Sequence, residues 1–235
     1  MIPAKVRAGL FFYKKGIELM APVEPKKKKA VVFIDGQNLF YAAKEAFGYY
    51  YPNYDIKLLS KKICSNQGWD IEAIRFYTGV PDLQDDGFWH NFWHNKLTRM
   101  GQDGIKIFSR PLRYRNQTVR LPDGSSHIFL VGQEKGIDVR IAIDIIRLAH
   151  TKAYDVALIV SQDQDLSEVA EEIRLIANEQ NRWIKIASAF LISPTYDNKR
   201  GINKTDWIKI DKKTYDACID PNNYRNSAIS ESPVL

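Results

Sequence analysis

Three short segments of the sequence place acidic side chains where a predicted strand ends or a predicted helix begins. The acids are Asp35, Asp138, Asp163 and Asp165, and Asn38, Lys135 and Ser161 stand close to them in the chain. Carboxylates that gather in one place repel one another unless they take up protons or hold a cation. Their hard oxygen ligands suit Mg²⁺ or Mn²⁺. We therefore expect a divalent metal site if the three segments meet in the folded chain.

Each acid taken singly also has a structural explanation. An aspartate after a strand commonly caps the next helix, and an aspartate in the first helical turn is favoured by the helix dipole. Residues 161–165, however, supply a hydroxyl group and two carboxylates around one helix start, which is more than a single cap needs. The coincidence of acids in three separate segments favours a shared site.

Missing motifs narrow the chemistry further. The first strand is not followed by Gly-x-Gly-x-x-Gly, and no Gly-x-x-x-x-Gly-Lys-Ser/Thr occurs, so dinucleotide and P-loop sites lose their main support. Gln37 stands where a phosphatase of the haloacid dehalogenase type needs a second aspartate. Acids at strand tips without a phosphate-cradling loop indicate metal-assisted hydrolysis.

The elements that must position these acids alternate along the chain. Strands are predicted at 31–34, 69–80, 105–108, 156–160, 183–187 and 207–210, and helices at 39–47, 56–64, 82–100, 137–149 and 166–177. This alternation predicts an α/β fold with a mainly parallel sheet and right-handed crossovers. Residues 110–131 alternate differently and predict an antiparallel hairpin insertion. Ligands of such sheets bind at the carboxyl ends of the strands, where the acids stand.

Length and composition suit one domain with two terminal segments. The 235 residues carry a formal charge of +6 and a pI near 9.1, a balance that favours a polyanionic partner. We expect an N-terminal extension and basic linker at 1–29, one α/β domain at 30–211 that includes the hairpin insertion, and a C-terminal tail at 212–235. Met20 is a candidate for the natural start.

The cellular location follows from two absences in the sequence. The two cysteines, Cys64 and Cys218, lie far apart and in no metal-binding spacing, which fits a reducing compartment. No apolar run approaches the ~18 residues of a membrane span, and residues 1–20 make only a weak match to a signal peptide. We expect a cytoplasmic protein without a membrane partner.

The three acidic segments resemble the signature segments of the NYN family, a group of PIN-like nuclease domains that includes the LabA group. They read Phe-Ile-Asp-Gly-Gln-Asn at 33–38, Lys-Gly-Ile-Asp-Val at 135–139 and Ser-Gln-Asp-Gln-Asp-Leu at 161–166, in the order of the family. The resemblance covers roughly residues 30–190. The third segment usually reads Ser-Gly-Asp-x-Asp-Phe, and here Gln162 replaces the glycine and Leu166 the phenylalanine.

The resemblance implies a three-layer α/β/α PIN-like fold and a metal-dependent ribonuclease that uses Mg²⁺ or Mn²⁺. Asp35, Asp138 and Asp163 would be the catalytic, metal-binding acids, and Asp165 a further ligand or a neighbour of the ligands. Asn38 and Ser161 would orient the acids. Lys135 would meet a phosphate or neutralise an acid, and a solvated lysine is the alternative. Attack by an activated water would leave a 5′-phosphate and a 3′-hydroxyl.

The hairpin insertion offers a basic face for RNA. Its candidate binding residues are Arg110, Arg113, Arg115, Arg120 and Tyr114, because guanidinium groups pair with phosphates and an aromatic ring stacks on an unpaired base. The alternative is an ordinary solvated hairpin. A second basic loop contains Lys199, Arg200 and Lys204.

The rival hypothesis to a nuclease is a catalytically weak RNA-binding or adaptor module that keeps the fold and uses its acids structurally. Both hypotheses take RNA, single-stranded or structured, as the partner. The sequence leaves open whether two copies pair into a homodimer.

Overall fold

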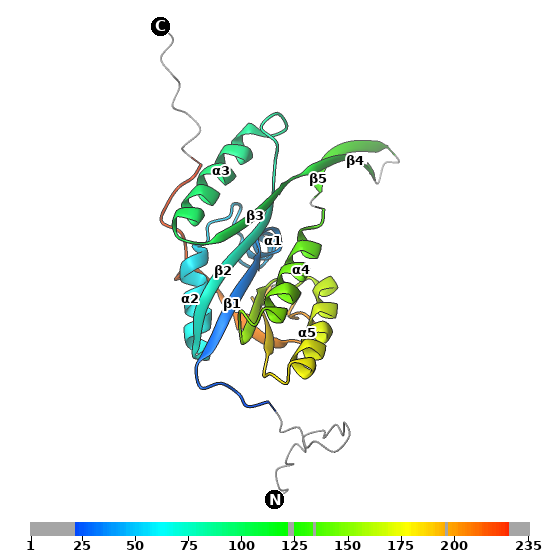
Figure 1. Ribbon diagram of the computed structural model, residues 1–235. Helices are drawn as coiled ribbons and strands as arrows, with labels where there is room; N and C mark the ends of the chain where they lie inside the picture. The colour runs from blue at the N-terminus through cyan, green and yellow to red at the C-terminus, as the bar shows by residue number, and fades with distance from the viewer. Residues whose placement is uncertain (1–21, 122–124, 134, 196, 226–235) are drawn as a thin grey trace, which may run out of the picture.

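The computed structural model of the protein describes residues 22–121, 125–133, 135–195 and 197–225 (Figure 1). Met20, most of the predicted N-terminal extension and the end of the predicted tail lie outside these residues. Among the described residues, no helix combines the length and apolar character that crossing a membrane requires.

Six parallel strands form the central sheet. They are β1 (Lys28–Asp35), β2 (Trp69–Val80), β3 (Lys106–Pro111), β6 (Val156–Val160), β7 (Lys185–Leu191) and β8 (Asp206–Ile210), in the order β3-β2-β1-β6-β7-β8. The chain leaves β1 toward β2 on one side and reaches β6 on the other. The direction of winding therefore changes between β1 and β6, and ligands of open parallel sheets bind at such a point.

Helices cover both faces of the sheet (Figure 1). On one face lie α1 (Gly36–Phe47), α2 (Ile56–Gln67) and α3 (Gly87–Gln102), and on the other lie α4 (Ile137–His150) and α5 (Ser167–Glu179). Strand β1 serves both cores because successive side chains point to opposite faces. Val32 and Ile34 pack with the first group of helices, and Val31 and Phe33 with the second. The predicted three-layer α/β/α arrangement is confirmed.

The predicted antiparallel insertion is confirmed too. Strands β4 (Arg113–Arg120) and β5 (Ser126–Gln133) pair with each other and form a separate two-stranded sheet between β3 and α4. The hairpin projects from the body of the domain on the side where β3 ends (Figure 1). Its turn, residues 122–124, lies outside the described residues.

The chain beyond β8 differs from the tail expected at 212–235. Helix α6 (Lys212–Asp216) follows the cap Asp211, and the side chains of Tyr215 and Cys218 are buried in the core. Farther on, Asp220 pairs at 2.8 Å with the buried Nζ of Lys96 on α3. Residues 212–220 are therefore packed against the domain. This packing was not predicted because α6 is short and polar, and its one buried residue, Tyr215, gives no helical pattern in the sequence.

Candidate active site

The three acids predicted to bind metal lie in one pocket. Asp35, Asp138 and Asp163 line a cavity of about 300 Å³ together with Gln37, Asn38, Tyr41 and Ile137. We call it the acidic pocket. It lies where β1 and β6 end and α4 begins, at the edge and switch point that the topology favours for a ligand. Residues more than 120 positions apart in the chain thus share one cavity.

Asp35 is the most deeply set of these acids. It ends β1 and accepts a hydrogen bond from the backbone N–H of Asn38 at 3.0 Å, so it caps α1. The next residue must be small, because a Cβ on Gly36 would lie 2.4 Å from Cζ of Phe76. The carboxylate is only 7% exposed. Burial, with a further contribution from the negative charge of Asp163, raises the pKa of Asp35 to about 6;.

Asn38 and Ser161 connect the ends of β1 and β6. The side-chain oxygen of Asn38 accepts the backbone N–H of Gln162 at 3.0 Å, and the Ser161 hydroxyl lies 3.5 Å from Oδ2 of Asp35. The same hydroxyl accepts the backbone N–H of Asp163 at 3.1 Å. These bonds fix the start of the loop after β6 against the end of β1. Their role in catalysis stays a prediction.

Gln162 has a structural role that the sequence did not reveal. Its side-chain amide donates to the carbonyl groups of Asn198 at 3.2 Å and Arg200 at 2.8 Å. Gln164 extends the attachment by donating to the carbonyl of Gly201 at 3.1 Å. Gln162, which replaces the glycine usual in the family, therefore attaches the loop 198–201 to the segment that carries Asp163. The sequence feature that indicates this attachment is the pair of glutamines, Gln162 and Gln164, that alternate with the acids.

Asp138 and Lys135 stand at the start of α4. Asp138 lies in the first turn of the helix and is partly exposed. The preceding Gly136 has φ +75°, and a Cβ there would lie 2.8 Å from a guanidinium nitrogen of Arg110. The positive φ favours glycine here, whereas the arginine tip is the end of a flexible side chain and can move aside. Lys135 is exposed, and its carbonyl group accepts a hydrogen bond from Arg110 at 3.3 Å.

Asp165 does not line the acidic pocket. It lies in a short 3₁₀ turn (Gln164–Leu166), is exposed, and donates its backbone N–H to Oδ1 of Asp163 at 3.0 Å. Its position beside Asp163 fits the lesser of the two roles considered for it, a neighbour of the ligands. That role stays a prediction.

No lysine or arginine side chain in the described part of the chain lines the acidic pocket. Among the described residues, none of the ion pairs involves Asp35, Asp138 or Asp163. Within the same part of the chain, no three carboxylate, histidine or cysteine side chains converge closely enough to form a ready-made metal site. The acids therefore share a cavity without meeting at one point.

A second pocket adjoins the acidic pocket. It has a volume of about 360 Å³, and we call it the aromatic pocket after six of its lining residues, Phe40, Tyr41, Tyr50, Trp89, Trp93 and Tyr114. Gln37 and Tyr41 line both cavities. Helix α1, helix α3 and the root of the hairpin thus surround a cavity next to the acids. The sequence did not predict it, because these aromatics come from segments far apart in the chain.

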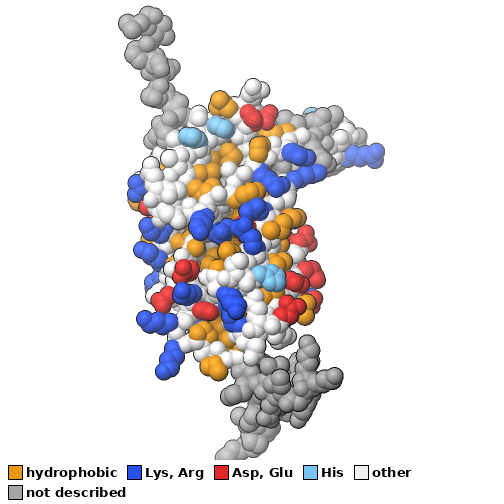
Figure 2. Space-filling model, viewed as in Figure 1, with side chains coloured by type: hydrophobic (Ala, Val, Ile, Leu, Met, Phe, Trp, Pro, Cys, Tyr) orange, Lys and Arg blue, Asp and Glu red, His pale blue; other side chains and the backbone are white. Residues whose placement is uncertain are grey.

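The residues predicted to bind RNA on the hairpin differ in how exposed they are. Arg113 and Arg120 are exposed, whereas Tyr114 is partly buried in the wall of the aromatic pocket. The Arg110 guanidinium lies 5.3 Å from the centre of the Phe108 ring. The side chain of Arg115 lies outside the described part of the structure. Lys and Arg side chains gather over the hairpin and the face below it (Figure 2).

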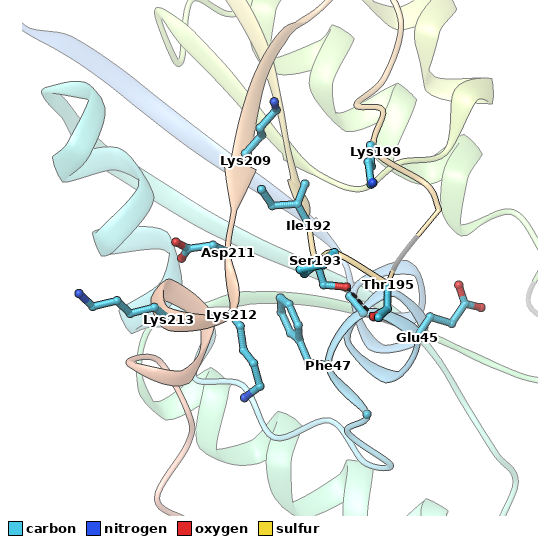
Figure 3. Close-up of a pocket in the computed structure, with 13 residues that line it drawn as sticks. Glu45, Phe47, Ile192, Ser193, Thr195, Lys199, Lys209, Asp211, Lys212 and Lys213 are labelled. Carbon is cyan, nitrogen blue, oxygen red and sulfur yellow. Dashed lines mark hydrogen bonds between the residues drawn. The ribbon is translucent and has the colours of Figure 1, made fainter.

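A pocket larger than these two lies elsewhere, beyond the ends of β7 and β8 (Figure 3). It has a volume of about 840 Å³ and contains Lys199, Lys209, Lys212 and Lys213 in its lining. Lys212 is held by Asp216 at 2.6 Å and by the hydroxyl of Tyr49. Lys199 belongs to the second basic loop predicted from the sequence. Lys204 of that loop instead pairs with Glu171 at 2.6 Å.

Comparison with known proteins gives a family and little beyond it. No curated protein matches the chain significantly in sequence. Among solved structures, the chain is similar to a Vibrio parahaemolyticus protein of unknown function, with 19% identity over 81% of this chain and 98% of that one and a TM-score of 0.46. It is similar also to a Giardia lamblia ribokinase, with 9% identity over 74% of this chain and 50% of that one and a TM-score of 0.33.

The family model of the NYN domain matches residues 29–200. These residues include β1 from its second residue onward and every residue that lines the acidic pocket, and the chain belongs to the NYN domain family.

Proposed function

We propose that this protein is a metal-dependent ribonuclease that hydrolyses RNA phosphodiester bonds and leaves a 5′-phosphate and a 3′-hydroxyl. The observation that carries the proposal is the shared lining of one pocket by Asp35, Asp138 and Asp163. The NYN domain belongs to a nuclease superfamily. PIN-like nuclease domains generally use divalent metals, and NYN nucleases typically act on RNA.

The chemistry of the pocket fits Mg²⁺ or Mn²⁺. Asp35, Asp138 and Asp163 offer only oxygen ligands, which hard divalent ions prefer. The charged form of Asp35 is costly in the protein alone, as its raised pKa shows, and a cation would relieve that cost. Because the acids do not converge on one point, they would hold an ion together with water and phosphate oxygens, as Mg²⁺ commonly is held in phosphate-processing enzymes. Such an ion supplies an activated water and offsets charge on the phosphate.

The chain's own residues would position the reacting groups. Asn38 and Ser161 hold the loop after β6 against the end of β1, so Asp35 and Asp163 keep a fixed relation. The exposed Lys135 beside α4 would meet a phosphate oxygen. Arg113 and Arg120 on the exposed hairpin supply positive charge for the RNA backbone. Whether two copies of the chain pair stays a prediction.

Cleavage of labelled single-stranded RNA tests the proposal. Wild-type protein with Mg²⁺ or Mn²⁺ should cleave, EDTA should stop the reaction, and Asp35→Asn should lower the rate by on the order of 10²-fold or more. The matched control is Asp70→Asn, which removes the same charge from an exposed residue at the start of β2, far from the acidic pocket. Cleavage that persists in EDTA or in Asp35→Asn would refute metal-dependent hydrolysis at this pocket.

The rival function is RNA binding without catalysis. The observation in its favour is the lack, among the described residues, of three metal-binding side chains that converge on one point. RNA that binds equally well with and without EDTA, and is never cut, would establish this rival in place of the nuclease.

A further inference from the structure

One face of α1 forms a wall shared by the acidic and aromatic pockets. Gln37, Phe40, Tyr41 and Lys44 all line the aromatic pocket, and their spacing of three and four residues places them on one side of the helix. Gln37 and Tyr41, which lie four residues apart on this side of α1, line the acidic pocket as well. A ligand held over the acids would therefore extend directly into the aromatic pocket.

Tyr41 stands at the boundary of the two pockets and faces solvent. Its side chain is 50% exposed, although aromatic rings are usually covered when they serve the core. The rings of Tyr41 and Phe40 lie 5.3 Å apart. Tyr50, another lining residue, is 76% exposed. An open cavity with exposed aromatic rings can bind a flat ring from outside.

Polar groups add selectivity to the aromatic pocket. Lys44 contributes a cation that makes no ion pair among the described residues. Asp86 caps α3 through one carboxylate oxygen, at 3.0 Å from the N–H of Trp89. Thr78, whose hydroxyl donates to the carbonyl group of Gly79 at 3.1 Å, also lines this pocket. Donors and acceptors around stacked aromatic rings are the features with which proteins recognise an unpaired base.

We propose that the aromatic pocket receives an unpaired base of the RNA strand whose phosphate lies at the acidic pocket, and that Tyr41 is its stacking partner. The inference rests on the proposed function, which places an RNA phosphate at the acidic pocket. It adds the class of RNA that the protein prefers. A base can enter such a pocket only when it is free of a duplex, because bases within a duplex are paired and stacked on one another. Single-stranded segments are therefore the preferred substrate.

Binding of RNA to the full chain in EDTA tests this pocket without cleavage. The probe is a short single-stranded RNA that carries 2-aminopurine, whose fluorescence is quenched when the base stacks, and affinity is measured by anisotropy. Tyr41→Ala should weaken binding roughly 5- to 100-fold and reverse the quenching. Tyr41→Phe, which keeps the ring, should restore both. Phe88→Ala is the matched control, because Phe88 on α3 is similarly exposed at 45% but lines neither pocket.

The outcomes separate this inference from the proposed function. A wild-type affinity and quenching in Tyr41→Ala would overturn the base pocket, even if cleavage remains metal-dependent and is lost in Asp35→Asn. Loss of quenching in Tyr41→Ala with retention in Tyr41→Phe would support the pocket, even if the protein cuts no RNA. A duplex of the same sequence should bind Tyr41→Ala and wild type equally. An equal loss for duplex and single strand would also overturn the inference.

Discussion

Two buried aspartates in this domain have opposite surroundings. Asp144 on α4 is 1% exposed, and guanidinium groups surround it at 2.8 Å from Arg75, 3.1 Å from Arg140 and 3.2 Å from Arg147. The hydroxyl of Tyr77 donates to it at 2.9 Å. Asp35 is 7% exposed and makes none of the ion pairs of the described residues.

The difference separates a structural acid from a candidate functional one. A buried carboxylate is expensive unless a cation and hydrogen bonds compensate its charge. The protein supplies that compensation to Asp144 from its own side chains and leaves Asp35 beside another acid in an open pocket. Burial, together with the negative charge of Asp163, raises the pKa of Asp35 to about 6. This difference supports the proposal that a divalent ion compensates the charge of Asp35.

The largest effect expected from this comparison is on stability at Asp144. Asp144→Asn should lower the free energy of unfolding by about 3 to 5 kcal/mol, because it leaves three guanidinium groups beside a neutral buried side chain. Asp35→Asn should leave the fold intact, since the amide oxygen still accepts the N–H of Asn38. Urea unfolding monitored by circular dichroism measures both. Equal losses of unfolding free energy in the two variants would show that the arginines around Asp144 do not set it apart from Asp35.

The pH dependence of stability gives a smaller effect with a defined sign. The pKa of Asp35 is about 6 in the folded chain against 3.8 for an ordinary aspartate. Between these pH values the folded state holds more protons than the unfolded state, so stability falls as the pH rises. The wild type should lose roughly 3 kcal/mol relative to Asp35→Asn from about pH 4 to pH 6 and above.

Unfolding of the two proteins in metal-free buffer across this range measures the difference. The difference in the free energy of unfolding between wild type and Asp35→Asn should become constant above the pKa of Asp35 in the folded state. A constant difference from acid to neutral pH would mean that Asp35 titrates as an ordinary exposed carboxyl group.

The smallest expected effect is stabilisation of the fold by a divalent cation. Mg²⁺ or Mn²⁺ at ten times its dissociation constant should stabilise the wild type at neutral pH by about 1.4 kcal/mol, because the ion binds only the folded state. Thermal unfolding should show this shift, and excess EDTA should reverse it. Asp35→Asn should show no shift, whereas Asp70→Asn should respond like the wild type. An equal shift in all three proteins would indicate ion binding outside the acidic pocket.

The regular elements were predictable wherever local pattern and packing agree. Strand β6 occupies the expected residues 156–160, five apolar positions that are all buried, and β1 extends its predicted run by a few residues at its start. Helix α3 begins at Gly87 instead of 82, because Asp86 and not an earlier residue caps it. Helix α6 was missed because one buried tyrosine gives no detectable period.

The sequence by itself determined the alternation of strands and helices, the acids at their ends and the order of the NYN segments. These features depend on neighbours a few residues away, through side-chain periodicity and capping. Only the tertiary structure decided that Asp35, Asp138 and Asp163 share a pocket, that Asp165 lies outside it and that Tyr41 opens onto an aromatic cavity. The parallel sheet brings together strand ends that are more than 120 residues apart, and no local pattern records which side chains then meet.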